Sequence, residues 1–552
     1  MERHPLQVLR NIGRAGEIVS VLASHGFGDV VERIGLQKYI RWGKRRLLRR
    51  PPETQLTTAQ RVRLTLETLG PTFIKFGQVL STRPDLMSDD IIQELSQLQE
   101  QVPPFDGDLA VAQVEAELGG NIDKLFAEFD RQPLAAGSLG QVHRARHHDG
   151  SELAIKIRRP DALANVERDL ALMAETAPAF AMIPQFAVFD PPGLVAQFSR
   201  TVRRELNFRR EGKTMVEFRR LFARDATLHV PLVYEDLTTD AVLTMEFVSG
   251  VRADDIDGLR KMGLEPRQLA ANGARIFLKQ VFEFGLFHGD PHPGNLRVLK
   301  DGSIALLDFG MVGILEATMR DQLVDLLVTV VRNRVDQGVT LVQQLGQATG
   351  PVNVVLLRAD VADFLDRYYG VPLDQLNIGR MLGDFISLMS SHSLRCPADL
   401  MLLLRALISL DGLGRKLDPT FNLAAEVAPF IEQVVRRRYD PKQLLARAVS
   451  EAGAFLQVAH DLPLSLNRTI QKLSQDDLRI QLEHQGLNKL IHEFDRSSNR
   501  IVVGLVTSAL VVSSALVLRS DSASYWLAIP IFLLSGLLGI WLIYGILTSG
   551  RL

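Results

Sequence analysis

Two long runs without a charged residue near the C-terminus most strongly constrain the fold. The first, "IVVGLVTSALVVSSALVL", covers residues 501–518, and the second, "YWLAIPIFLLSGLLGIWLIYGIL", covers residues 525–547. At about 1.5 Å rise per residue, either run is long enough as a helix to cross a hydrocarbon core of roughly 30 Å. The link "RSDSAS" between them is short, so the pattern predicts a two-helix transmembrane hairpin over 501–547.

Residues in and around these runs support a hairpin and indicate its orientation. Aromatic residues near both ends of the second run resemble a membrane-interface belt, and Ser535 and Gly539 have the spacing that lets helices pack closely. Arg496 and Arg500 before the first run favour a cytoplasmic N-terminal part, whereas Arg519 in the link favours the opposite orientation. We therefore expect the N-terminal part to face the cytoplasm.

Composition limits the remaining possibilities. A chain of 552 residues is too long for one core. Its 63 basic and 64 acidic residues nearly balance, so we expect no nucleic-acid partner. One cysteine excludes an internal disulfide and a cysteine-based metal cluster. The oligomeric state stays open.

The first 55 residues contain a basic amphipathic segment, "IRWGKRRLLRR", at residues 40–50. It fits an anionic membrane surface or a solvated basic helix face equally well. The start of the chain lacks the apolar core of a signal peptide, and we predict no cleaved targeting segment.

Hydrophobic periodicity divides the rest. Residues 56–125 read as a helical extension, with breaks at Gly70-Pro71 and "VPPFDGD". Residues 126–248 begin with a hairpin around Asp149-Gly150 and continue through helical patterns. The stretch "AVLTMEFVSG" at their end reads as a strand that runs out into a connector. Residues 249–435 are mainly helical, with a helix expected at 262–286 and a hairpin around Asp301-Gly302. Residues 436–500 read as a helical linker.

Chemistry-bearing residues follow one another in a significant order. A small-residue loop at 135–141 precedes Lys156 in the strand "LAIKI", and a helix then offers Glu205 or Glu211. Next come "HGDPHPGN", with Asp290, and "LLDFG". Phosphoryl transfer needs these parts: a cover over the phosphates, a lysine held by an acid, an aspartate near the nucleophile and oxygen ligands for magnesium.

The loop "HGDPHPGN" is the most specific of these parts. Asp290 and Asn295 have the spacing of a kinase catalytic loop, in which the aspartate accepts the hydroxyl proton and the asparagine reaches a metal. Asp308 follows one short hairpin later, so Asn295 and Asp308 are expected to converge on one Mg²⁺ ion. His288 and His292 are expected to orient the loop.

Three histidines, His143, His147 and His148, have a spacing that could bind a metal on a helix. They fall instead in a predicted strand and turn with no acidic partner nearby. We expect them to be packing or surface residues.

At this point the residues resemble the UbiB (AarF) family of atypical protein-kinase-like proteins, from about residue 56 to 422. "KFGQVLSTRPDL", at 75–86, looks like the family's Lys-x-Gly-Gln signature, and "AAGSLGQVH" is similar to its alanine-rich loop. The resemblance implies an α+β, two-lobed protein-kinase-like fold with a helical N-terminal extension over the active site. In that family Lys75 and Gln78 occupy space that a protein substrate would need.

The resemblance also implies function. It suggests a membrane-anchored ATPase or kinase in the bacterial inner membrane that uses ATP (or ADP) and Mg²⁺, and supports ubiquinone biosynthesis with quinone-pathway enzymes or precursors as partners. Asp290 and Lys156 are the implied catalytic residues, together with the signature residues Lys75 and Gln78. Asn295 and Asp308 are implied metal ligands. Nucleotide contacts are implied for the loop residues, both candidate glutamates and the hinge, namely Ala135, Ala136, Gly137, Ser138, Leu139, Gly140, Gln141, Glu205, Glu211, Glu246 and Val248.

Two departures from the family pattern leave questions open. The usual Glu-x-Asp appears as "ELN", with Asn207 in place of a carboxylate, and Gly137 stands where alanine is usual. Glu205 and Glu211 therefore remain rival partners for Lys156. Because "HGDxxxxN" also resembles aminoglycoside and choline kinases, a small-molecule or lipid kinase is the alternative, with a nucleotide-gated scaffold as the third possibility.

Overall fold

The computed structural model describes residues 5–33, residues 56–427 with short gaps, residue 429 and parts of 501–539. The gaps are 82, 84–86, 99–102, 184–185, 187–189, 349 and 373–374. Residues 1–444 form one compact unit and residues 445–552 a second, and each is described by itself. The basic segment at 40–50 and most of the predicted linker lie outside the described residues.

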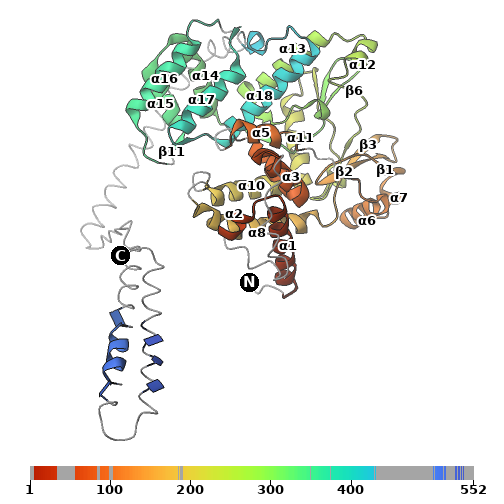
Figure 1. The fold of residues 1–552 in the computed structure, drawn as a ribbon. Coiled ribbons are helices and arrows are strands. Elements are labelled where there is room, and N and C mark those ends of the chain that lie inside the picture. Colours follow the sequence, from red (N-terminus) through yellow and green to blue (C-terminus); the bar gives the residue numbers. More distant parts are fainter. Residues whose placement is uncertain are drawn as a thin grey trace, which may run out of the picture. The chain divides into compact units, whose positions relative to one another are not determined.

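An antiparallel four-stranded sheet in the order β1-β2-β3-β5 begins the site-forming part of the first unit (Figure 1). Its strands are β1 (Glu128–Ala136), β2 (Gly140–Arg146), β3 (Glu152–Arg158) and β5 (Val242–Glu246). Gly150, with φ of 91°, supplies the left-handed turn between β2 and β3, and Asp149 accepts a hydrogen bond from the Ser151 amide. The predicted hairpin is therefore confirmed, and so is a strand within "AVLTMEFVSG", which covers Val242–Glu246.

Strand alternation separates the two faces of this sheet. Ile155 and Ile157 are fully buried against Val114 of α6 (Gly107–Leu118). Lys156 lies between them in the sequence and so points to the opposite face. There α11 (Phe208–Leu221) packs Met215 against the sheet. Strand β3 thus presents a lysine to α11.

The region predicted as a helical extension contains α3 (Thr58–Leu69), α4 (Pro71–Ser81), α5 (Asp89–Leu95), α6 and α7 (Ile122–Leu125). Thr57 and Gln60 form a capping box that begins α3, and Gly70, with φ of 95°, ends it. A Cβ atom at Gly77 would lie 2.4 Å from Leu98 and 2.7 Å from Leu66. The signature glycine therefore lets α4 approach its neighbours.

Four further helices pack with this extension. They are α1 (Pro5–Ser24), α2 (Gly28–Arg33), α8 (Ala162–Ala181) and α10 (Pro191–Glu205). Arg14 of α1 lies 2.9 Å from the buried carboxylate of Asp169 on α8 and donates to the Leu69 carbonyl at 2.7 Å. Asn207 accepts a hydrogen bond from the Arg210 amide and caps α11. The amide in "ELN" thus has a structural role.

The second lobe of this unit contains short strands and a large group of helices. The strands form the sheet β4-β9-β8-β6 and two ribbons, β7 with β10 and β11 with β12. Their bounds are β4 (Leu228–His229), β6 (Val251–Arg252), β7 (Leu286–His288), β8 (Leu296–Val298), β9 (Ile304–Leu306), β10 (Val312–Ile314), β11 (Gln347–Ala348) and β12 (Leu394–Arg395). Gly302, with φ of 80°, turns the predicted β8–β9 hairpin.

Helices α14 to α18 gather together in Figure 1 and share a large apolar core. The helices of this lobe are α12 (Ile256–Lys261), α13 (Pro266–Leu278), α14 (Ala317–Arg332), α15 (Val335–Leu345), α16 (Val354–Tyr368), α17 (Ile378–Ser391) and α18 (Ala398–Leu417). The expected helix at 262–286 was wrong at both ends. Gly263, with φ of 75°, interrupts its start, and after a π-helical segment, Lys279–Phe284, residue 286 is already in β7.

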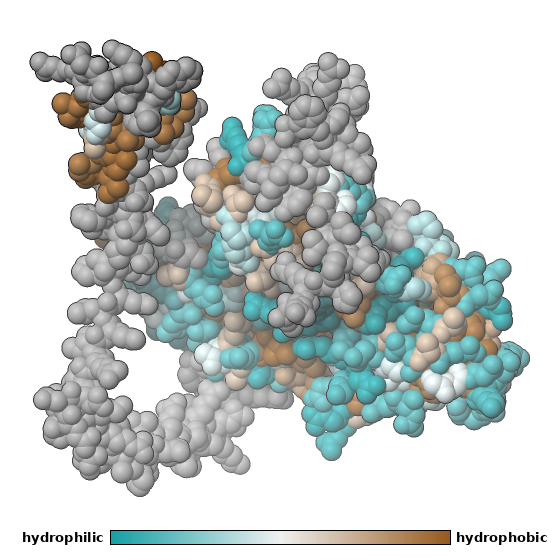
Figure 2. Space-filling view, turned by 90° about the horizontal axis from the view of Figure 1, so that it is seen from below, coloured by the Kyte–Doolittle hydropathy of each residue, from teal (hydrophilic) through white to brown (hydrophobic). Residues whose placement is uncertain are grey.

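The second unit is described only in part. Its described residues include a helical stretch at 504–513, and large apolar side chains there are exposed, for example Leu505 at 67%. Such apolar residues are coloured brown in Figure 2. A Cβ at Gly539 would lie 3.8 Å from the Thr507 methyl, so the two runs lie side by side at this point.

The structure does not show the predicted transmembrane hairpin. Across the described residues, no helix has both the length and the apolar character that a membrane span requires. Much of 501–547 lies outside the described residues. The two spans therefore remain a prediction.

Candidate functional site

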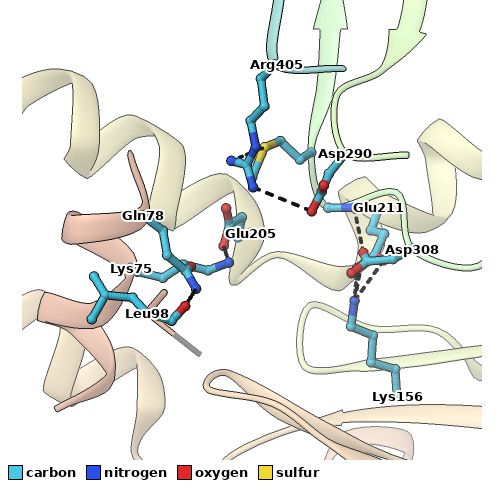
Figure 3. Close-up of polar contacts among 11 residues, drawn as sticks. Lys75, Gln78, Leu98, Lys156, Glu205, Glu211, Asp290, Asp308 and Arg405 are labelled. Atoms are coloured by element: carbon cyan, nitrogen blue, oxygen red, sulfur yellow. Dashed lines mark hydrogen bonds and ion pairs between the residues drawn. The ribbon is translucent and has the colours of Figure 1, made fainter. Parts of the chain in front are cut away.

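The structure settles which glutamate pairs with Lys156. The Lys156 ammonium lies 2.8 and 2.9 Å from the two carboxylate oxygens of Glu211 and 3.3 Å from Asp308 Oδ1 (Figure 3). Glu211 also accepts a hydrogen bond from the Phe309 amide at 3.2 Å. One carboxylate of α11 thereby holds both the strand lysine and the segment that follows β9.

Burial and the neighbouring charges shift the pKa values of Lys156, Glu211 and Asp308. Burial acts to lower the pKa of Lys156, but the carboxylates of Asp308 and Glu211 outweigh it and hold that pKa above its ordinary value. Burial raises the pKa of the Glu211 carboxyl to about 7 despite the neighbouring ammonium. The Asp308 side chain is open to the cavity, and although the surrounding protein acts to raise its pKa, the charge of Lys156 holds that pKa below its usual range. Lys156 and Asp308 are thus charged at neutral pH.

Glu205, the rival candidate, pairs with the extension. Its carboxylate lies at the end of α10, 3.0 Å from the Lys75 ammonium, and both side chains are largely buried. Gln78, one helical turn further along α4, donates to the Leu98 carbonyl at 3.2 Å. Lys75 and Gln78 therefore fix α4 against α10 and the segment that follows α5 (Figure 3).

The loop after β7 places Asp290 beside a residue that the sequence reasoning missed. Arg405 of α18 lies 3.8 Å from the Asp290 carboxylate. The sequence did contain a sign of this role. Arg405 is the one charged residue in the apolar run "LMLLLRALISL", and a charge in such a helix needs a partner. A Cβ at Gly289 would lie 2.7 Å from Leu402 of the same helix, so the loop packs closely on α18.

Hydrogen bonds fix His288 and Asn295 beside Asp290. The Asp290 amide donates to His288 Nδ1 at 3.2 Å, so His288 Nε2 carries the proton and donates to the Asp308 carbonyl. Burial lowers the pKa of His288, which fits a neutral ring that orients the loop. Asn295 Nδ2 donates to the Asp290 carbonyl at 3.2 Å. Because the amide nitrogen of Asn295 makes this bond, its amide oxygen is the atom that would bind a metal.

Residues 135–141 cover the end of β1, the turn at 137–139 and the start of β2. Ser138 is 2% exposed, and its hydroxyl has no hydrogen-bond partner in the described structure. Gln141 accepts a bond from the Phe105 amide at 3.1 Å and donates to His143 Nε2 at 2.7 Å. Gln141 thus anchors the turn, whereas the Ser138 hydroxyl suits an incoming ligand oxygen.

His143 is a packing residue, as expected. It is fully buried, its ring stacks on Phe129, and its Nδ1 donates to the Asp130 carbonyl. His147 pairs with Asp149 at 3.1 Å, so the expectation that no acidic partner lies near these histidines was wrong. Among the described residues, no group of three or more His, Cys, Asp or Glu side chains could hold a metal.

His143 predicts a pH effect on stability. Burial lowers its pKa below the ordinary 6.5, so its contribution to stability is present above that value and is lost as pH falls through the lowered pKa. We expect the decrease in melting temperature from about pH 7.5 to about pH 5.5 to be smaller in His143→Asn than in wild type. The exposed His148→Asn should behave like wild type. Equal decreases in wild type and His143→Asn would refute the assignment.

A cavity of about 330 Å³ collects most of these residues, within the usual range for ligand sites. Its lining comes from the extension, the β1–β2 turn, β3, α10, α11 and the loops after β7 and β9. The predicted site residues on its wall are Lys75, Ala135, Ala136, Gly137, Ser138, Leu139, Gly140, Gln141, Lys156, Glu205, Asp290, Asn295 and Asp308. Segments far apart in the sequence thus meet at one polar hollow.

The predicted hinge residues lie elsewhere. Glu246 ends β5, where its carboxylate accepts from the Leu232 amide at 3.0 Å and lies 3.0 Å from His229 Nε2. Neither Glu246 nor Val248 is among the described residues that line this cavity. The Glu246 side chain therefore braces the connection after β5.

Asn295 and Asp308 fit a magnesium ion. Both line the cavity, and the Asp308 side chain is 46% exposed within it. Mg²⁺ commonly takes one or two protein oxygens and completes its shell with water and phosphate. One carboxylate and one amide oxygen beside a lysine suit that arrangement.

The fold and the site define a kinase-like protein, and the comparisons identify the family. The ABC1 atypical kinase-like domain matches residues 97–340, the UbiB helical domain residues 361–422, and the ABC1/UbiB kinase-like C-terminal domain residues 485–548. An uncharacterized Synechocystis protein is 33% identical over 87% of this chain and 82% of its own. The chain belongs to the ABC1/UbiB family of atypical kinase-like proteins.

Two further similarities were found. An uncharacterized protein from the hydrogenase 1 5′ region of Clostridium pasteurianum is 28% identical over 98% of this chain and 100% of its own. Among solved structures, the complex of Rv3197 with erythromycin from Mycobacterium tuberculosis matches 62% of this chain and 87% of its own at 23% identity. The TM-score of that match is 0.43.

Proposed function

We propose that this chain binds Mg-ATP in the 330 Å³ cavity and transfers or hydrolyses its terminal phosphate. The observation that carries this proposal is that Lys156, Asp290, Asn295 and Asp308 line the same hollow. Phosphoryl transfer depends mainly on positioning and charge stabilisation, and these residues offer both. Bound Mg²⁺ would neutralise charge that develops on the phosphate oxygens.

Each residue of the site has a separate role in this reaction. Lys156, fixed by Glu211, binds phosphate oxygens, and Asn295 and Asp308 hold the ion. Asp290 accepts the proton of the attacking hydroxyl or water. Arg405, 3.8 Å away, holds the Asp290 carboxylate in place. Ser138 in the β1–β2 turn donates to the nucleotide.

The extension contributes to the wall of this site. Lys75 and Glu205 both line the cavity and are joined by an ion pair, so α4 forms part of the cavity wall. We propose that this contact restricts transfer to other proteins and favours ATP hydrolysis.

Replacing Lys75 tests this restriction. We expect Lys75→Ala to change nucleotide affinity several-fold or to allow autophosphorylation, because it opens the cavity wall and removes the ammonium 3.0 Å from the largely buried Glu205 carboxylate. Titration with nucleotide and incorporation of labelled terminal phosphate measure the two effects. Lys213→Ala, an exposed position on α11, is the matched control. Unchanged affinity together with no incorporation would contradict the proposal.

We further propose that residues 501–547 anchor the protein in the bacterial inner membrane, with the cavity on the cytoplasmic side. The exposed apolar side chains and the absence of charge in the two runs support this. Deleting 501–552 should move the protein from the membrane pellet to the supernatant after cell fractionation. A truncated protein that stays in the pellet after a high-salt wash would oppose this anchor.

We propose that the protein supports ubiquinone biosynthesis. Membership of the family supports this pathway. A membrane anchor would also keep the catalytic unit close to the apolar quinone precursors in the bilayer. The test is quinone profiling in cells that lack the protein. Wild type should restore quinone levels, and Asp290→Asn should not. Normal quinone levels without the protein would reject this role.

A further inference from the structure

A second large cavity, of about 310 Å³, lies in the same unit. Its walls are α1, α3, α4, α8 and α10, four of which can be followed by their labels in Figure 1. The lining is almost entirely apolar and includes Ile18, Phe73, Phe76, Met173 and Val195. No part of the proposed nucleotide chemistry uses this space.

The cavity is suited to a hydrocarbon and poorly suited to water. Among its described lining residues, the polar ones are Thr65, Thr176 and Glu175. The threonine hydroxyls already donate to carbonyls of their own helices, those of Arg61 at 2.7 Å and Leu172 at 2.9 Å. Water needs several polar partners to remain in such a space. Well-packed interiors contain few voids of this size, and each destabilises in proportion to its volume.

The volume of this cavity and the charged groups in its lining define the ligand more closely. An apolar cavity of roughly 150 Å³ holds one benzene ring, so this one has room for on the order of a dozen carbon atoms. Glu175 is exposed, which places a carboxylate at the rim. No described lining residue is basic, so an anionic head group would lack a cation to pair with, and Glu175 already has an interaction of its own. The matching ligand is a single chain of about ten carbons with an uncharged polar head.

Two wall helices connect this cavity to the nucleotide cavity. Helix α4 turns Phe73, Phe76 and Leu80 toward the apolar cavity, whereas its Lys75 lines the polar one. Helix α10 contributes Val195 near its start and carries Glu205, the partner of Lys75, at its end. The edge-to-face contact of Phe76 with Phe198, at 5.1 Å, joins the two helices between these points.

We propose that this cavity is a binding site for the hydrocarbon chain of an uncharged amphiphile, and that its occupancy changes nucleotide affinity through α4 and α10. A ligand that fills this cavity contacts both α4 and α10, the two helices that carry the Lys75–Glu205 ion pair. By linkage, nucleotide then changes the affinity for the chain by the same factor. The second part of the inference rests on the proposed nucleotide function, and the first does not.

Photoaffinity labelling of the full-length protein tests the site. The probe is 1-decanol that carries a diazirine, and labelled peptides are mapped by mass spectrometry. We expect saturable labelling of α1, α4, α8 or α10 that excess 1-decanol suppresses and decanoate suppresses several-fold less well. Ala177→Leu, which fills the cavity from α8, should reduce labelling about ten-fold. Ala174→Leu, exposed on the same helix, should not.

Ala15→Leu, on the α1 wall, serves as a second blocking variant if Ala177→Leu fails to fold. Absence of saturable labelling in these helices, or undiminished labelling in folded blocking variants, would overturn the site. Nucleotide titration with and without saturating 1-decanol tests the coupling, with a several-fold change expected in wild type and none in Ala177→Leu. Equal affinities in wild type would overturn the coupling. Saturable labelling in a protein that binds no nucleotide would support the site and reject the proposed function.

Discussion

Asp308→Asn is expected to reduce phosphate release from ATP by on the order of 1,000-fold. The substitution keeps the shape and an acceptor for the Gly310 amide, which donates to Asp308 Oδ1 at 2.9 Å. It removes the negative charge that faces Lys156 and the ion, which an amide cannot replace. Because the side chain is partly exposed in the cavity, the fold should persist.

A phosphate-release assay and circular dichroism of the same samples separate chemistry from folding. Asp257→Asn, at an exposed position on α12, is the control and should retain activity. A folded Asp308→Asn variant with wild-type turnover would remove Asp308 from the proposed metal site.

Glu211→Ala is expected to lower the free energy of unfolding by about 3 kcal/mol. The Glu211 side chain is 3% exposed and binds both the Lys156 ammonium and the Phe309 amide, so its loss leaves buried donors unsatisfied. Lys156 also loses the carboxylate that fixes its position, and nucleotide affinity should fall with stability.

Denaturant unfolding followed by circular dichroism measures this effect, with Glu217→Ala as the control. Glu217 lies on the same helix, is 42% exposed and pairs with Arg220, so its replacement should change stability by less than about 0.5 kcal/mol. Equal stabilities of the two variants would show that Glu211 does not hold the site together.

The local turn chemistry explains why much of the fold could be predicted from the sequence. Asp149-Gly150 and Asp301-Gly302 both mark hairpins, because each glycine takes the left-handed conformation that the turn requires. The helix expected from residue 262 begins at Pro266 instead, since the periodicity continues through Gly263 although the backbone does not.

The sequence could not assign the partners of the two lysines. Glu205 and Glu211 lie close together in the sequence, but Asn207 ends one helix region and begins the next, so the carboxylates point to different partners. Lys75 takes the first and Lys156 the second. Such a change of direction depends on tertiary packing, which residue spacing does not encode.

Equilibrium binding of ATP to the full-length protein tests the central claim most directly. With Mg²⁺ present, we predict saturable binding of one nucleotide per chain, at least about ten-fold weaker when the ion is chelated and similarly weakened by Lys156→Ala. Folded wild-type protein that shows no saturable ATP binding with Mg²⁺ would contradict the claim.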